Sequence, residues 1–446
     1  MTTIPTIPNV NAGGSLDIIQ TTFKLSAISN AATWNNGNAT QLQSDLLTLV
    51  EDNLGANSPL KPYIGSWDLV WGPCVFQNVG STDADNAMYV AYNADIDYYV
   101  VAIAATNIQS LYDWETEDFN VGLTNRVAFP NGISAPNCVN PSSVTDVGLV
   151  SLGTATGVTH LLSMSPPSEN VPGYGQNLQQ FLKSKESTGA TLVFTGHSLG
   201  GALSPTLAFW LYPQGSNDGQ FWANVFVLPT AGATPGDLDF ATAFNTAFPQ
   251  TAVTGTNATT YDYAYWNTVI WNQYDTVPHA WCNLSWASPG QAPGNVIWDL
   301  VLGTTTLHTT YVKSCTCLYG PLSGLALQEI PFLIGKANQA AGNVVTNDVV
   351  SSSYTHLQNQ MLPAPQPSPP PGGVSTIKQF LNYLGQQHMT EYATLFDVPP
   401  DPFNANVNWG EALWNVLGTL IEDLLKDLTV TIDTVPTAGA PAPTDA

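Results

Sequence analysis

Positive charge is scarce in this sequence. It holds 9 Lys+Arg against 33 Asp+Glu, which gives a net charge of −24 with histidine neutral. Proteins that follow nucleic-acid phosphates or dock on anionic bilayers depend on clustered cations. The charge balance therefore argues against a nucleic-acid binder and against an anionic membrane surface.

Long apolar runs and a leader segment are also missing. No stretch approaches the roughly 18 apolar residues that a membrane-spanning helix needs. The start, MTTIPTIPNV, has neither the positive region nor the apolar core of a signal peptide. We expect no transmembrane segment and no Sec export. Secretion by another route, a mature secreted form and a cytoplasmic location stay open.

Cysteine is sparse and odd in number, which excludes a disulfide scaffold and leaves the redox compartment undecided. The pair Cys315 and Cys317 is separated by one residue, whereas zinc knuckles separate paired cysteines by two to four. Asp83 and Asp85 lack the remaining ligand positions of an EF-hand and predict a turn. No metal and no cofactor are expected. The five cysteines are Cys74, Cys138, Cys282, Cys315 and Cys317.

The hydrophobic residues, 44% of the 446, are enough for a large core. Their pattern predicts a helix over 40–53, a hairpin of strands at 87–92 and 97–104, and a helix over 176–185. A strand at 191–195, a helix at 199–211 and strands near 224–227 and 268–271 follow. Strands that alternate with helices predict a mostly parallel sheet with helices on both faces.

A proline run, PAPQPSPPPGG, lies at 363–373. This segment must be extended or irregular, and it could be a linker. Beyond it, Leu413, Leu417 and Leu420 continue a helical spacing, and Asn408 with Glu411 suggests a capping box. A helix docked on the core is the plain interpretation. A helix on a membrane surface would usually have a basic polar face, whereas the polar face here is acidic. The tail from 434 to 446 is expected to be disordered.

The segment that carries chemistry is Thr195-Gly196-His197-Ser198-Leu199-Gly200-Gly201. It contains G-x-S-x-G directly after a predicted strand and directly before a predicted helix, the setting of a nucleophile elbow. Small Gly196 and Gly200 let strand and helix approach closely, and the helix N-terminus favours negative charge beside the nucleophile. We expect Ser198 to be a nucleophile.

The elbow, GHSLGG at 196–201, resembles that of the class 3 lipases, which have the α/β-hydrolase fold. VVAIAATNIQSLYDWETED at 100–118 is similar to the family's oxyanion strand and the acidic segment after it, although Ala104-Ala105 replaces Arg-Gly. The segment 225–240, VFVLPTAGATPGDLDF, is similar to the family's strand that leads to a Phe-Gly-x-Pro turn, although the turn itself matches poorly. NQYDTVPH at 272–279 matches Asn-x-x-Asp-x-Val-Pro. The resemblance spans roughly residues 87–278, with a further piece near residue 388, which is about half of the chain.

The resemblance assigns a role to each group that ester hydrolysis by serine needs. Asp275, on a loop after a strand, would orient the base, with Asp262 a weaker alternative. The N–H of Leu199 follows the nucleophile, and the resemblance implies Thr106 as the second oxyanion donor, through its N–H and its hydroxyl.

The base must be a histidine after the acid, and His279, His308, His356 and His388 qualify. His388 is favoured because QQHMTEYATLF is similar to the family's His-x-x-x-Tyr at the start of a helix, with Tyr392 one turn later. His356 is the alternative base because it lies closer to Asp275 in the sequence. His279 lies too close to Asp275. His197 is expected to be structural, and His160 to be a loop or lining residue.

Residues 107–119 follow the expected oxyanion residue, where the family carries a mobile lid. Ile108, Leu111 and Trp114 share one helical face, which fits an amphipathic lid and equally fits a fixed surface helix. The region 281–362, rich in apolar residues, could cover an acyl pocket or pad the core.

These observations predict one α/β-hydrolase catalytic domain over 1–400, with a long insertion at about 281–373, a packed helical segment at 401–433 and the tail. The expected function is hydrolysis of acylglycerol or related esters, at a lipid–water interface in the case of a lipase. Other esterases, phospholipases, polyester or feruloyl esterases and acyltransferases share this chemistry. A catalytically silent lipid-binding protein is the alternative from another class.

Overall fold

The computed structural model describes a large part of the chain. The described residues are 4–110, 113–118, 120–139, 145–217, 221–282, 333, 336, 339–342, 344–346, 349–365, 368, 374–404 and 407–433. The predicted tail at 434–446 and most of the predicted insertion lie outside them.

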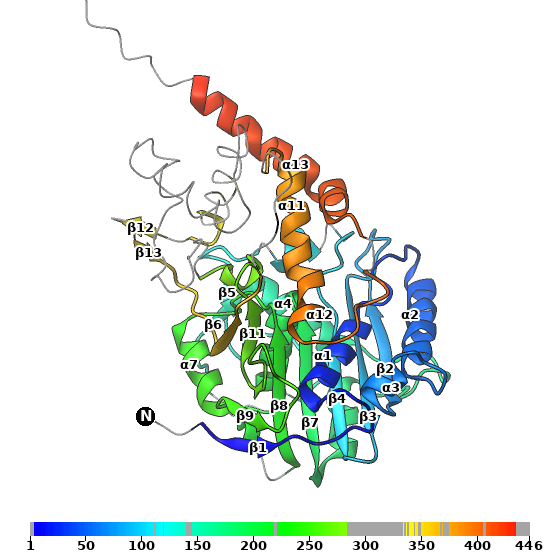
Figure 1. The fold of residues 1–446 in the computed structure, drawn as a ribbon. Coiled ribbons are helices and arrows are strands. Elements are labelled where there is room, and N and C mark those ends of the chain that lie inside the picture. Colours follow the sequence, from blue (N-terminus) through cyan, green and yellow to red (C-terminus); the bar gives the residue numbers. More distant parts are fainter. Residues whose placement is uncertain are drawn as a thin grey trace, which may run out of the picture.

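A single large sheet organises the described residues (Figure 1). Its strand order is β14-β11-β8-β7-β4-β3-β2. The pairs from β4 to β14 are parallel, and the β2–β3 and β3–β4 pairs are antiparallel. This arrangement confirms the predicted hairpin and the mostly parallel sheet. The strands are β2 (Asp68–Phe76), β3 (Asn86–Asn93), β4 (Tyr98–Ile103), β7 (Ser187–His197), β8 (Trp222–Thr230), β11 (Val269–Asn272) and β14 (Asn359–Leu362).

Short strands form smaller sheets beside this one. β1 (Thr6–Pro8) pairs with β9 (Thr251–Thr254), which also pairs with β10 (Tyr265–Trp266). Two further pairs are β5 (Arg126–Ala128) with β6 (Leu149–Ser151), and β12 (Val344–Thr346) with β13 (Val349–Ser351).

Alternation along the central strands creates two cores. Val100 and Ala102 of β4 lie in one buried cluster, and Val101 and Ile103 lie in the other. Successive side chains of a strand point to opposite faces, so a strand that is apolar throughout feeds both cores. The run YYVVAI is therefore buried on both sides, as expected for a central strand.

Helices cover both faces of the sheet. Residues of α1, α2, α3, α11, α12 and α13 belong to the first core, and those of α4, α5, α6 and α7 to the second. Figure 1 shows α1 and α12 in front of the strands, with α13 running away from the body. The helices are α1 (Ile18–Ile28), α2 (Ala39–Leu54), α3 (Lys61–Ile64), α4 (Leu152–Ser163), α5 (Leu178–Lys185), α6 (Leu199–Leu211), α7 (Leu238–Ala247), α11 (Ile377–Gly385), α12 (Glu391–Leu395) and α13 (Trp409–Asp433).

Helix α1 was not evident from the sequence pattern. Asp17 caps it, because its side chain accepts from the N–H of Gln20 while the Gln20 side chain accepts from the N–H of Asp17. Both Gln20 and Lys24 are buried, and Lys24 pairs with Asp401. A helix that buries polar side chains lacks the clean apolar stripe on which a helix prediction depends.

The segments on both sides of the proline run join the same structure. β14, before the run, pairs with β11 in the large sheet, and α11, after it, packs into the first core. In α13, Leu413 and Leu417 are buried, and the N–H of Glu411 donates to the Asn408 side chain over 3.3 Å. The C-terminal helix is thus docked on the core through its first turns.

Candidate active site

Ser198 lies in a strained turn between β7 and α6. Its φ of 58° and ψ of −122° fall in a region that residues with a Cβ rarely adopt. A Cβ at Gly196 would lie 2.2 Å from the Gly200 carbonyl oxygen, and one at Gly200 would lie 2.6 Å from that of Ile103. Strand and helix backbones therefore touch here, and only glycine fits at either position. The sharp strand-to-helix turn expected at this motif is present.

The Ser198 hydroxyl faces His388, and His388 faces Asp275. Ser198 Oγ lies 2.7 Å from His388 Nε2, and His388 Nδ1 lies 2.8 Å from Asp275 Oδ2. All three residues are buried, and the Asp275 side chain is 0% exposed. Since the Asp275 carboxylate can only accept, Nδ1 carries a proton and Nε2 is left to accept from the serine hydroxyl. The structure thus brings together the nucleophile, base and acid expected from the sequence.

Three hydrogen-bond donors hold the Asp275 carboxylate in place. Tyr392 Oη donates to Oδ2 over 2.8 Å, and the N–H of Val277 donates to Oδ1 over 3.0 Å. Tyr392 Oη also accepts from the N–H of Asn272, over 3.0 Å. Burial and the nearby Asp275 charge raise the pKa of Tyr392 well above its usual value, so the phenol stays a donor. The third donor is His388 itself. These contacts satisfy a carboxylate that is otherwise shielded from water.

His388 lies within a helical run, and its expected place at the start of a helix is wrong. Residues Gln386–Thr390 form a π-helical turn that joins α11 to α12. The N–H of Glu391 donates to the Gln386 carbonyl, five residues back. Such π-turns are rare and occur frequently at functional sites. Asn272 holds this turn from β11, because its amide donates to the Gln387 carbonyl over 2.9 Å.

His197 lies behind the base, and its contacts are structural, as expected. Its Nε2 donates to the His388 carbonyl over 2.7 Å, and its Nδ1 lies 2.9 Å from Thr230 Oγ1. Burial, with the charge of His388, lowers the pKa of His197 to about 3. A neutral imidazole with one donor and one acceptor thus ties the helix of His388 to β8.

The other candidate residues lie elsewhere. His356 contacts neither Ser198 nor Asp275, and burial together with nearby His279 lowers its pKa to about 4. His279 packs edge-on against Trp271, and burial lowers its pKa. Asp262 accepts from Tyr265 at the surface. His308 lies outside the described residues, as do Cys315 and Cys317.

The two expected oxyanion donors, the N–H groups of Leu199 and Thr106, have different surroundings. Leu199 is the first residue of α6, so no carbonyl of that helix can accept its N–H. Thr106 follows β4, is 7% exposed, and donates its hydroxyl to Asp118 Oδ2 over 2.9 Å. That contact leaves the N–H of Thr106, rather than its hydroxyl, as the group that could bind an oxyanion. Asp118 was not predicted from the sequence, because it is one of several acidic residues in that segment.

The expected lid falls partly outside the described residues. Ile108 lies in a turn and is buried in the first core, apart from the helical residues Asp113–Asp118. Leu111 lies outside the described residues, and only the backbone of Trp114 is described. The amphipathic lid stays a prediction.

His160 is on helix α4 rather than in a loop, which corrects its expected place. Its Nδ1 lies 2.9 Å from Glu117 Oε1 and 3.1 Å from Asn86 Oδ1. Its ring stacks on Phe76, with centroids 3.8 Å apart. His160 is therefore engaged away from the Ser198 hydroxyl.

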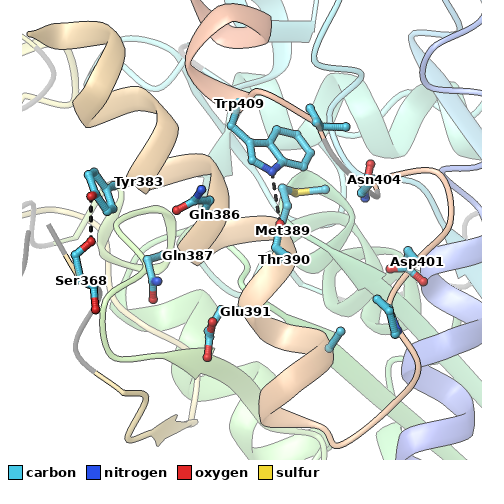
Figure 2. Close-up of a pocket in the computed structure, with 13 residues that line it drawn as sticks. Ser368, Tyr383, Gln386, Gln387, Met389, Thr390, Glu391, Asp401, Asn404 and Trp409 are labelled. Atoms are coloured by element: carbon cyan, nitrogen blue, oxygen red, sulfur yellow. Dashed lines mark hydrogen bonds between the residues drawn. The ribbon is translucent and has the colours of Figure 1, made fainter. Parts of the chain in front are cut away.

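A cavity of about 510 Å³ lies beside the helix of His388 (Figure 2). Its lining includes Gln386, Gln387, Thr390, Asn404 and Trp409, and Trp409 Nε1 donates to Thr390 Oγ1 over 3.2 Å. None of Ser198, His388 and Asp275 is among the described residues that line it. This cavity is separate from the Ser198 site.

A mostly parallel sheet, a nucleophile elbow and a histidine and acid in the chain order Ser, Asp, His define an α/β-hydrolase fold. Comparison with known proteins agrees. Residues 100–283 match the family model described as Lipase (class 3), which confirms the resemblance to that family over this segment. The match supports an ester hydrolase of the lipase type, with a lipid or ester as substrate. No curated protein matches the chain.

Solved structures support the same fold. The crystal structure of M37 lipase matches at 22% identity, covering 93% of this chain and 99% of that one, with a TM-score of 0.58. The Yarrowia lipolytica LIP2 lipase matches at 16% identity over 58% of this chain and 73% of its own, with a TM-score of 0.35. Lipase II from Rhizopus niveus matches at 16% identity over 59% and 74%, with a TM-score of 0.33. Of these three similarities, the one to M37 lipase supports the shared fold. Among the described residues, no helix is long and apolar enough to cross a bilayer.

Proposed function

We propose that this chain hydrolyses carboxylic esters through a covalent acyl-enzyme on Ser198. The observation that carries the proposal is the chain of contacts from Ser198 Oγ to His388 Nε2, at 2.7 Å, and from His388 Nδ1 to Asp275, at 2.8 Å. A serine hydroxyl becomes a nucleophile only when a base takes its proton as it attacks. His388 is within reach, in the tautomer that can accept that proton.

The reaction follows from these positions. Ser198 Oγ attacks the ester carbonyl carbon while His388 accepts the hydroxyl proton, and buried Asp275 stabilises the imidazolium. The N–H groups of Leu199 and Thr106 bind the oxyanion. His388 then gives its proton to the leaving alcohol. Water, activated by the same histidine, releases the acid and restores Ser198.

Acylglycerol is the substrate class that we propose first. Support comes from the family match, which is to lipases, and from the predicted apolar insertion and lid. Phospholipid, feruloyl and polyester substrates require the same residues, as does acyl transfer to an alcohol in place of water. Chain-length preference and product analysis separate these activities.

The test is turnover of p-nitrophenyl esters from C2 to C16 by the wild type and by Ser198→Ala, His388→Ala and His356→Ala. We expect loss of turnover with the first two variants and wild-type activity with His356→Ala, which is the matched histidine control. Circular dichroism checks folding. A long-chain optimum would support a lipase, and a short-chain optimum an esterase.

Four outcomes would contradict the proposal or its details. Turnover that survives Ser198→Ala would remove the nucleophile. Loss of turnover in His356→Ala alone would reassign the base. Tight binding of long-chain lipid without any turnover in the wild type would favour a silent lipid-binding protein. Ester exchange with an added alcohol, at the expense of acid release, would reassign the reaction to acyl transfer.

A further inference from the structure

Glu117 is a buried carboxylate that the proposed reaction does not use. Its side chain is 0% exposed, and both of its oxygens have donors. His160 Nδ1 lies 2.9 Å from Oε1, and Asn86 Nδ2 donates to Oε2 over 3.0 Å. Burying a carboxylate is costly unless it is paired in this way. Glu117 therefore fixes the backbone that bears it to two other elements, β3 through Asn86 and α4 through His160.

Helix α4 is shaped to receive this residue. A Cβ at Gly153 would lie 2.0 Å from the Glu117 carbonyl oxygen, and one at Gly157 would lie 2.6 Å from Glu117 Oε2. Gly153, Gly157 and His160 are spaced by four and three residues, so they share one face of the helix. Glycine inside a helix is unfavourable relative to alanine. Two such positions on the face that meets Glu117 indicate a seat for that residue.

The next residue along the chain connects this seat to the oxyanion donor. Asp118 accepts the Thr106 hydroxyl over 2.9 Å. Burial raises the pKa of Asp118 to about 7, and the nearby Glu117 charge adds to this rise. Since Asp118 follows Glu117 directly, any shift of the Glu117 backbone moves the group that orients Thr106.

We infer that Glu117, seated by His160 and Asn86 on the glycine face of α4, is a positioning residue for the oxyanion donor Thr106. The inference rests on the proposed hydrolysis by Ser198. Preset donors stabilise an oxyanion because they need not reorganise as the charge forms. The seat of Glu117 holds the Thr106 donor in place from outside the site, through Asp118 and the Thr106 hydroxyl. Glu117 itself touches no reacting atom.

Two variants disturb the seat in different ways. Glu117→Gln keeps the side-chain shape but presents an amide donor to a partner that also donates. Gly153→Ala leaves every polar group in place and adds a methyl group whose nearest contacts are all atoms of Glu117. Removal of an oxyanion donor lowers kcat by roughly 10² to 10³. We expect a displaced donor to lower kcat about tenfold to a hundredfold, with KM near the wild-type value. Thr159→Ala, also on α4, is the matched control, because its hydroxyl donates to the Ala155 carbonyl of the same helix.

A double-variant cycle separates positioning from general loss of structure. If Glu117 acts through the Thr106 hydroxyl, then Glu117→Gln should lower kcat no further in a Thr106→Val background. A structural defect unrelated to Thr106 would multiply with the Thr106→Val effect. Melting temperatures by circular dichroism accompany each variant. If Glu117→Gln does not fold, Asn86→Ser takes its place, because it removes the amide that donates to Glu117 Oε2 together with its contact to His160 Nδ1.

The outcomes distinguish this inference from the proposed function. Loss of kcat in both seat variants, with no further loss beside Thr106→Val, supports it. Wild-type kcat in both, or independent multiplication of the two effects, overturns it while Ser198-dependent turnover stands. A wild type without Ser198-dependent turnover would overturn the proposed function and this inference with it.

Discussion

Replacing Tyr392 by phenylalanine tests the acid end of the site. The Tyr392 hydroxyl donates to Asp275 Oδ2 over 2.8 Å and accepts from the N–H of Asn272 over 3.0 Å. Phenylalanine keeps the ring, which packs edge-on against His197 with centroids 4.8 Å apart. The change therefore removes two buried hydrogen bonds and little packing.

The size of the effect follows from these two bonds. A hydrogen bond to a charged group contributes about 1.5–3 kcal/mol, and a buried N–H left without a partner costs about 1–3 kcal/mol. We expect Tyr392→Phe to lower the free energy of unfolding by roughly 2.5–6 kcal/mol. Asp275 keeps its contacts with His388 and Val277, so turnover should fall by no more than about tenfold.

Urea unfolding gives the sharper readout, because the expected loss of free energy of unfolding is larger than the expected loss of turnover. The control is Tyr383→Phe, because that hydroxyl donates to the Ser368 carbonyl near the surface, away from Asp275. A urea midpoint equal to that of the wild type, or an equal shift in Tyr383→Phe, would refute the reasoning.

Three further predictions follow from the site and its surroundings. His388→Ala should lower kcat by at least about 10³ while His356→Ala keeps wild-type turnover, and equal losses would contradict the assigned base. Gly200→Ala should abolish activity and lower the melting temperature, because its Cβ would lie 2.6 Å from the Ile103 carbonyl oxygen, and a fully active variant would contradict the contact. Burial lowers the pKa of His197 to about 3 and that of His356 to about 4, so below pH 6.5 these two side chains bind more protons in the unfolded chain than in the folded one. Burial raises the pKa of Asp118 to about 7, which opposes this effect at one site. Stability should therefore fall as the pH drops from 6.5 toward 4, and His356→Gln should reduce that slope by about 1.4 kcal/mol per pH unit in urea titrations. An unchanged slope would show that His356 is not buried in its neutral form.

Local patterns in the sequence predict the elements that build the site. Helix α6 occupies the residues expected for it, and β7 and β8 extend the expected strands by a few residues. These predictions succeed because helix and strand periodicities, and the glycines at 196 and 200, act over a few residues. Helix α1 escapes prediction since Gln20 and Lys24 are buried on partners far along the chain.

The sequence by itself was enough to propose Ser198 as the nucleophile, because the constraints on this residue come from its own neighbours in an elbow of five residues. It also narrowed the acid, through the short match around Asp275. Only the tertiary structure decided between His388 and His356, since His388 lies 190 residues from Ser198 and 113 from Asp275. Closing long loops adds little entropy cost with length, so sequence distance does not discriminate between them. The seat of Glu117 likewise depends on residues of β3 and α4 that meet only in the fold.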